Sequence, residues 1–368
     1  MKKFQVVIAI AFLFAFSTLA LGVRIAHSRG PAAPDTAQVH MVITSQSLDD
    51  SREPPVLRSE NLQLKVGKEN TQVEQLIPAQ GANAAMQLII LIDDTCKPEP
   101  IGNNLNDLRD FVTAQPSTTA IGVAYMSNTT VQITQNLTLD HAAAARGIRL
   151  PRGSLSAMDS SYLSLVSLVQ AWPQQNLRRQ VLMITDGIDR LRNDTNSGSS
   201  PFSVDSLDTF GPPLPTAAAI DIPGMGAMSS MTGMPAMPSM TTMPQIPVDA
   251  STASSVSQKY GVIVHSIFAT GVGRFGRSAW EAQLGQAGVA QITEETGGEY
   301  FALGTQNAVS FRPYLERLQK IFNNQYFLVF RVPPENRKGR LQRVRIHSEE
   351  PNADTAAADN VWVPAAGS

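Results

Sequence analysis

The most informative segment for the fold class of this chain is Leu88-Ile89-Ile90-Leu91-Ile92-Asp93-Asp94-Thr95. Five consecutive apolar residues lead directly into two carboxylates and a threonine. A strand with one wet face alternates apolar and polar residues, so an unbroken apolar run predicts a strand covered on both faces. Polar residues at its end then lie at the edge of a sheet.

The same pattern returns later in the chain. Residues 181–184 form a second apolar run, which ends in Thr185-Asp186-Gly187, and residues 261–268 form a third. Helical apolar spacing lies between and around these runs, at residues 105–112, 162–172, 280–296 and 311–322. Buried strands that alternate with helices predict an α/β fold with a mostly parallel sheet flanked by helices. Ligands of such sheets bind beyond the carboxyl ends of the strands.

Composition limits the class of protein further. The chain has 368 residues, enough for two or three folded units. Only 16% of the residues are charged and acids slightly outnumber bases, which argues against nucleic-acid binding through a basic surface. The single cysteine, Cys96, excludes an intramolecular disulfide and a cysteine-rich metal site.

The first 22 residues read as a signal peptide. Lys2 and Lys3 precede an uncharged apolar run over residues 6–21, and small residues allow cleavage after Ala20 or Gly22. The run is short for a spanning helix, which needs about 20 residues. We therefore expect a periplasmic or secreted protein, with membrane contact only if the signal stays uncleaved. Residues 23–36 lack periodicity and read as a linker.

The segment before the first buried strand has a different character. Residues 37–80 contain alternating apolar residues and a turn at Gly67, which predicts short antiparallel strands. Such a segment is too small to bury a core alone and needs partners from elsewhere in the chain.

The motifs in their order resemble those of a von Willebrand factor type A domain over roughly residues 85–322. The resemblance is carried by Asp93-Asp94-Thr95, by Thr185-Asp186-Gly187, and by residues 268–273 and 295–298. Residues 186–190 and Asn324-Gln325-Tyr326 look like the exported "von Willebrand factor A-related" proteins abundant in acidobacteria. That group implies an accessory β unit, which would combine residues 37–80 with C-terminal strands in residues 325–365.

Membership would imply a metal-ion-dependent adhesion site for Mg²⁺ or Mn²⁺. The positions that match its motif are Asp93, Thr95, one of Ser154 and Ser156, and Asp186. Lys97 stands where the last serine of the first loop belongs, and an ammonium cannot ligate a cation. Two hypotheses stay open: a weakly bound ion, or Lys97 replacing the ion by pairing with Asp93 or Asp186 while Thr95 caps the next helix.

Residues 193–250 interrupt the α/β rhythm with a Pro-, Ser-, Gly- and Met-rich insertion that we expect to be disordered. A methionine recurs there at every third position: Met225, Met228, Met231, Met234, Met237, Met240 and Met243. Thioethers select Cu(I) and oxidise reversibly, so metal handling or oxidant buffering in the envelope is the alternative function. A low-complexity insertion in a tolerant loop is the simpler interpretation.

Enzymatic and nucleotide-binding signatures are weak. Residues 271–276 match a glycine-rich dinucleotide fingerprint, but the next strand lacks the acid that this fingerprint needs at its end. His265 lies within an apolar strand, where a hydrogen-bonded structural histidine is the commoner case. We therefore expect no nucleotide and no catalysis, and predict an exported protein-binding or adhesion-type module with a degenerate metal site and an unidentified protein partner.

Overall fold

The computed structural model describes residues 37–49, 52–96, 98–153, 159–173, 177–187, 189, 249–268, 279–302, 310–333 and 336–365. The signal and linker segments, Lys97, Ser154, Ser156, the methionine run and residues 271–276 lie outside these ranges. Within the described part, no helix combines the length and apolar character that crossing a bilayer requires.

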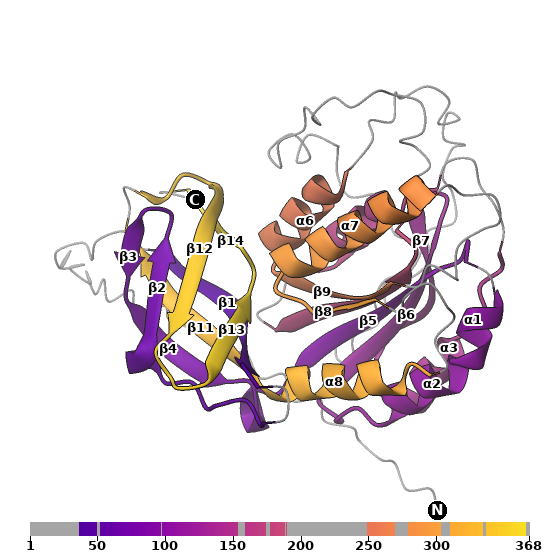
Figure 1. Ribbon diagram of the computed structural model, residues 1–368, viewed down its shortest axis with the longest axis horizontal. Coiled ribbons are helices and arrows are strands. Elements are labelled where there is room, and N and C mark those ends of the chain that lie inside the picture. The colour runs from indigo at the N-terminus through magenta and orange to yellow at the C-terminus, as the bar shows by residue number, and fades with distance from the viewer. Residues whose placement is uncertain are drawn as a thin grey trace, which may run out of the picture. The chain divides into compact units, whose positions relative to one another are not determined.

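A six-stranded sheet forms the centre of the α/β part (Figure 1). Its strand order is β10-β9-β8-β5-β6-β7, and every neighbouring pair is parallel except β6 and β7. The strands are β5 (Met86–Asp93), β6 (Thr119–Ser127), β7 (Thr130–Thr138), β8 (Arg178–Thr185), β9 (Val262–Phe268) and β10 (Tyr300–Ala302). The helices are α1 (Pro98–Asn103), α2 (Leu105–Thr113), α3 (His141–Gly147), α4 (Ser161–Ala171), α6 (Ala250–Lys259), α7 (Ala279–Glu295) and α8 (Arg312–Asn323).

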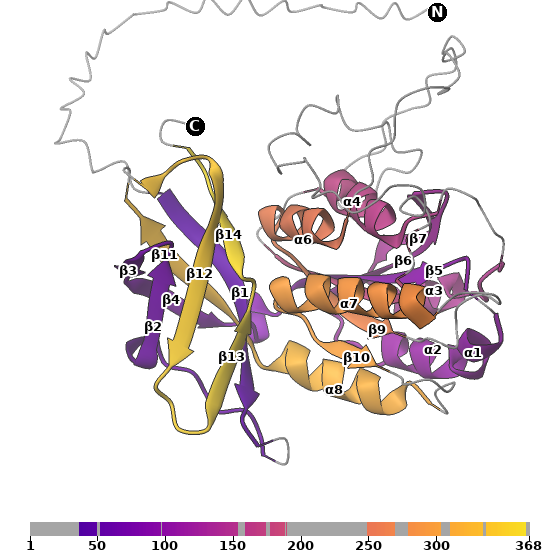
Figure 2. The same cartoon turned by 45° about the horizontal axis from the view of Figure 1, so that its top comes forward.

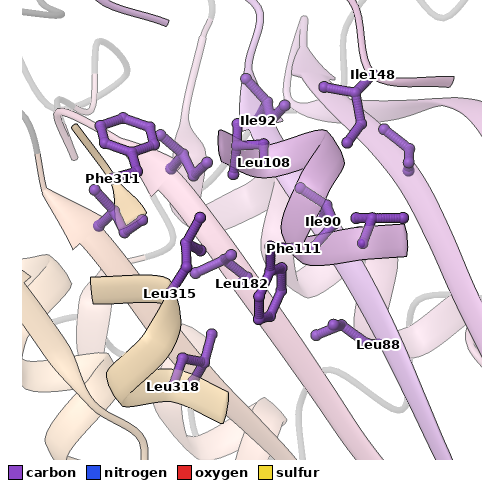
Figure 3. Packing of buried hydrophobic residues seen from close by; sticks show 14 of the residues in the cluster. Leu88, Ile90, Ile92, Leu108, Phe111, Ile148, Leu182, Phe311, Leu315 and Leu318 are labelled. Carbon is purple, nitrogen blue, oxygen red and sulfur yellow. The ribbon is translucent and has the colours of Figure 1, made fainter. Parts of the chain in front are cut away.

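The central strand β5 is buried along its whole length, as its unbroken apolar run predicts. Leu88, Ile90 and Ile92 pack on one face of the sheet with residues of α2, α3 and α8. Figure 3 shows Phe111 of α2 and Leu315 of α8 directed toward this face. Ile89 and Leu91 point to the opposite face and pack with residues of α4, α6 and α7, the helices seen together on one side of the sheet in Figure 2. The predicted α/β layering is confirmed.

Strands that precede and follow the α/β part in the sequence form two antiparallel sheets. Their orders are β13-β1-β11-β4 and β14-β12-β2-β3. The strands are β1 (Ala37–Ser47), β2 (Leu62–Val66), β3 (Glu69–Thr71), β4 (Val73–Pro78), β11 (Gln325–Val332), β12 (Arg340–Ser348), β13 (Ala353–Ala357) and β14 (Asn360–Val363). Their inner faces share one apolar cluster that includes Ile43, Leu64, Leu328 and Phe330. This is the accessory β unit of the expected fold class.

One strand begins earlier than its sequence suggests. The apolar run starts at Val181, yet β8 begins at Arg178, and both Arg178 and Arg179 are buried. The Arg178 guanidinium is accommodated because it donates to the carbonyls of Phe322 (2.8 Å) and Ala84 (2.6 Å) and to Gln325 Oε1 (3.1 Å). Burial lowers the pKa of Arg178 to about 10. The strand therefore includes charged residues that hydropathy periodicity alone would place before its first residue.

Candidate functional site

The two carboxylate-bearing turns lie next to each other at the carboxyl edge of the parallel sheet. Strands β5 and β8 are direct neighbours, and Ile92 is paired with Ile184. Asp93 ends β5, while Thr185 ends β8 and is followed by Asp186. Thr185 Oγ1 donates to Asp93 Oδ2 over 2.9 Å, so the structure brings the two turns into contact across 92 positions of sequence.

The Asp93 carboxylate is the centre of a buried cluster of hydroxyl groups. Its Oδ1 accepts hydrogen bonds from the Thr95 amide (3.0 Å) and the Thr95 hydroxyl (2.6 Å). Its Oδ2 accepts from Thr185 and, over 3.4 Å, from Ser161 Oγ. The hydroxyls of Ser161 and Thr185 lie 3.0 Å apart. We call Asp93, Thr95, Ser161 and Thr185 the hydroxyl cluster.

Ser161 enters the cluster because of how α4 begins. The Ser160 side chain caps the helix by accepting from the Leu163 amide over 3.3 Å, which makes Ser161 the first helical residue. The predicted second-loop hydroxyls, Ser154 and Ser156, lie outside the described residues, and the sequence analysis did not include Ser161 or Thr185 among the site residues. Two serines directly before an apolar helical run are the available sequence signal for this helix start.

The turn after β8 is held by close packing against α7. Gly187 has a φ of +64°, and a Cβ built on it would lie 2.5 Å from the carbonyl oxygen of Gly285 in α7. The Gly187 amide donates to Thr185 Oγ1 (3.0 Å), and its carbonyl accepts from the Tyr162 hydroxyl (3.0 Å). Glycine at positions 187 and 285 therefore lets the helix approach the turn that carries Asp186, which is itself buried.

Asp94 is committed to a neighbouring arginine. Its carboxylate accepts hydrogen bonds from both terminal nitrogens of Arg149, at 2.6 and 2.9 Å, and from the Arg152 amide, at 2.8 Å. The guanidinium also stacks 3.8 Å from the centre of the Tyr125 ring. The hydrogen bond to Asp94 raises the pKa of Arg149. This ion pair ties the loop around residue 150 to the Asp93 turn and takes Asp94 out of consideration as a metal ligand.

The oxygen atoms at this edge of the sheet are of the types that a hard divalent cation prefers as ligands. Carboxylate and hydroxyl oxygens are the ligands that Mg²⁺ takes, and hydroxyls leave room for an acid from a partner. The hydroxyl protons in the cluster are directed at Asp93, and rotation about Cβ–Oγ turns the oxygen lone pairs outward instead. Among the described residues, no three or more His, Cys, Asp or Glu side chains gather at one place. The described residues therefore fit a site that binds a divalent cation weakly, through oxygen ligands.

Two groups with chemical reactivity in principle are enclosed. Cys96 forms no disulfide and has 1% of its surface exposed. His265 is wholly buried; its Nδ1 accepts from the Glu299 amide (2.9 Å), so the neutral ring carries its proton on Nε2 and donates to Gln180 Oε1 (2.6 Å). Burial lowers the pKa of His265 to about 3. This histidine has the structural role that its strand context predicts.

Comparisons with known proteins concern the architecture only. No family model and no curated protein matches the sequence. Among solved structures, an aerotolerance-related membrane protein from Bacteroides fragilis is 13% identical with a TM-score of 0.36, over 65% of this chain and 98% of that one. The ArnB paralog VWA2 from Sulfolobus acidocaldarius is 8% identical with a TM-score of 0.33, over 89% and 76%.

A third similar structure is the pilus adhesin SpaC from Lactobacillus rhamnosus GG, in its open conformation. It is 11% identical with a TM-score of 0.40, over 86% of this chain and 48% of the adhesin, so this chain spans about half of that protein's length. Likenesses this distant say nothing of activity or ligands. The strand order, the flanking helices and the adjacent turns at the sheet edge agree with the α/β architecture that the resemblance to a von Willebrand A domain implies.

Proposed function

We propose that this chain is an exported, non-catalytic protein-binding module that engages its partner through the carboxyl edge of the parallel sheet. In this proposal the hydroxyl cluster and Asp186 hold a divalent cation, Mg²⁺ or Mn²⁺, with millimolar affinity. A carboxylate of the partner protein completes the coordination of the ion. The signal-like first 22 residues support the export in this proposal.

The observation that carries the proposal is the convergence of three hydroxyl side chains on the Asp93 carboxylate. They come from the turn after β5, the start of α4 and the end of β8. A buried carboxylate needs hydrogen-bond partners, but a purely structural site has no need to draw hydroxyls from three separate elements at the ligand-binding edge of the sheet. Hydroxyls also leave the cluster with little negative charge of its own, which is why we expect weak ion binding.

The ion's competitor in this proposal is the Lys97 ammonium. It follows Thr95 by two positions, where it adds a positive charge to the loop that would hold the cation. In this proposal the carboxylates that ligate the ion are Asp93 and Asp186, because Asp94 is paired with Arg149. We propose that these two carboxylates outweigh the ammonium and that its charge accounts for an affinity below that of an intact adhesion motif.

Partner capture tests the proposal. The full chain is immobilised and exposed to envelope extract in Mg²⁺, in chelator, and in chelator followed by excess Mg²⁺. We expect one set of proteins to bind in Mg²⁺, to be released by chelator and to return with Mg²⁺. Asp93→Asn keeps an acceptor for Thr95 but lacks the charge. This variant and Asp186→Ala should each capture at least about tenfold less protein than the wild type.

The matched control removes a carboxylate elsewhere. Glu316 is exposed on α8, and Glu316→Gln should capture the same proteins as the wild type. Capture that ignores chelator and is equal in all four proteins would assign partner binding to another surface and refute the proposal.

A further inference from the structure

A second site lies at the opposite end of the parallel sheet, where β8 and β9 begin. Arg179 is paired there with Val262, whereas the hydroxyl cluster lies at the far ends of the strands. A cavity of about 430 Å³ opens beside this pair. Its wall includes charged and aromatic side chains from several elements: His40, Arg179, Lys259, Tyr260, Phe327 and Trp362. The volume is in the range of about 300–1,000 Å³ that is usual for small-molecule sites.

Arg179 is the unusual member of this wall. It is 6% exposed, and its Nε is buried without a hydrogen-bond partner. One terminal nitrogen lies 3.5 Å from the Pro173 carbonyl, a distance at which a hydrogen bond is weak. The adjacent Arg178 also has a buried Nε without a partner, but its terminal nitrogens donate three hydrogen bonds of 2.6–3.1 Å. A buried guanidinium stays charged at neutral pH and is costly without a partner.

The described lining of the cavity supplies no carboxylate to compensate this charge, because it contains no aspartate or glutamate. Desolvation lowers the pKa of Arg179, and the electrostatic contribution that opposes it comes from Tyr260. The second cation, Lys259, lies over aromatic rings, with its ammonium 4.7 Å from the centre of the Trp362 ring. The surroundings are therefore positive and flat-sided.

We propose that this cavity binds a small organic carboxylate with a flat, apolar body. The carboxylate would receive hydrogen bonds from the terminal nitrogens of Arg179, because a guanidinium and a carboxylate match as a planar, two-bond pair, whereas the Nε is enclosed. The body of the ligand would pack on the rings of Tyr260 and Trp362. One guanidinium matches one carboxylate, which favours a monoanion over a phosphate dianion. This inference is independent of the function proposed for the carboxyl edge.

The test uses calorimetry and thermal unfolding of the full chain with three probes. Benzoate carries the charge and the ring, uncharged benzamide keeps the shape, and phenyl phosphate changes the anion. We expect benzoate to bind and to raise the Tm, and benzamide to do neither. In Arg179→Met, benzoate affinity should fall by about 10- to 100-fold, the range for loss of a charged hydrogen-bond partner.

Arg179→Met has a second readout that separates a ligand site from a structural arginine. Removing an unpaired buried charge should leave the ligand-free Tm unchanged or raise it by roughly 2–4 °C. The control Arg146→Met removes an exposed arginine of α3 and should bind benzoate as the wild type does. A lowered ligand-free Tm with no benzoate binding in the wild type would overturn the proposal, as would binding of phenyl phosphate but not of benzoate.

Discussion

Replacing Arg149 by methionine is expected to destabilise the fold by roughly 2–3 kcal/mol, because the buried Asp94 carboxylate loses its charged partner while Arg149 itself is 28% exposed. The Asp94 side chain is 5% exposed and loses two charged hydrogen bonds in this variant. The stacking of the guanidinium on Tyr125 is lost as well. Urea unfolding monitored by circular dichroism measures the change.

The chain offers a matched control for this prediction. The Arg152 side chain is also near Asp94, at 4.0 Å, but it is 57% exposed. Arg152→Met should cost less than about 1 kcal/mol, as exposed pairs do. The double variant Asp94→Asn/Arg149→Met should recover part of the loss, since the amide still accepts from the Arg152 backbone. Equal losses in the two single variants would contradict the assignment of Arg149 as the partner that neutralises Asp94.

Acid is expected to weaken the fold through His265. The pKa of its ring is about 3 in the folded protein because of burial, against an ordinary value of 6.5. Below pH 6.5 the unfolded chain therefore binds a proton that the folded chain does not, so the free energy of unfolding falls as the pH falls, until the pH reaches about 3. Each pH unit in this window costs about 1.4 kcal/mol, which amounts to about 3 kcal/mol by pH 4.

His265→Gln isolates this contribution. Glutamine can still donate to Gln180 and does not titrate, so the variant should lose about 3 kcal/mol less than the wild type between pH 7 and pH 4. His347→Gln removes an exposed histidine of β12 and should follow the wild type. Parallel pH curves for the wild type and His265→Gln would show that the ring is charged or solvated in the folded state.

The sequence predicts the layers of this protein because burial on two faces leaves a local trace. Alternate side chains of the run Leu88–Ile92 pack against the helices on the two faces of the sheet. The apolar residues of the helix that begins near Phe311 cover one of these faces. The adjacency of Asp93 and the turn at Asp186 also follows from local patterns, because parallel strands that end in polar residues share one edge.

The hydroxyl and arginine partners leave no such trace. Arg149 lies 55 positions from Asp94, and only the fold determines which arginine reaches a given carboxylate. Thr185 reads as part of an apolar strand end, and Ser161 as one of several serines near a helix start. Arg178, which opens β8, is buried because carbonyls and the Gln325 side chain from distant segments accept its hydrogen bonds. The sequence alone therefore does not predict which polar residues pair over long distances along the chain.

Titration with Mn²⁺, followed by the loss of its free-ion electron paramagnetic resonance signal, measures whether the carboxyl edge of the sheet binds a cation. We expect one site of millimolar or tighter affinity in the full chain. Asp93→Asn and Asp186→Ala should abolish binding, Glu316→Gln should not change it, and Lys97→Ser should tighten it by about tenfold or more, because a hydroxyl replaces a like charge. Wild-type protein that binds no Mn²⁺ up to about 10 mM, with binding only after Lys97→Ser, would show that the ammonium takes the ion's place and would contradict the proposed cation site.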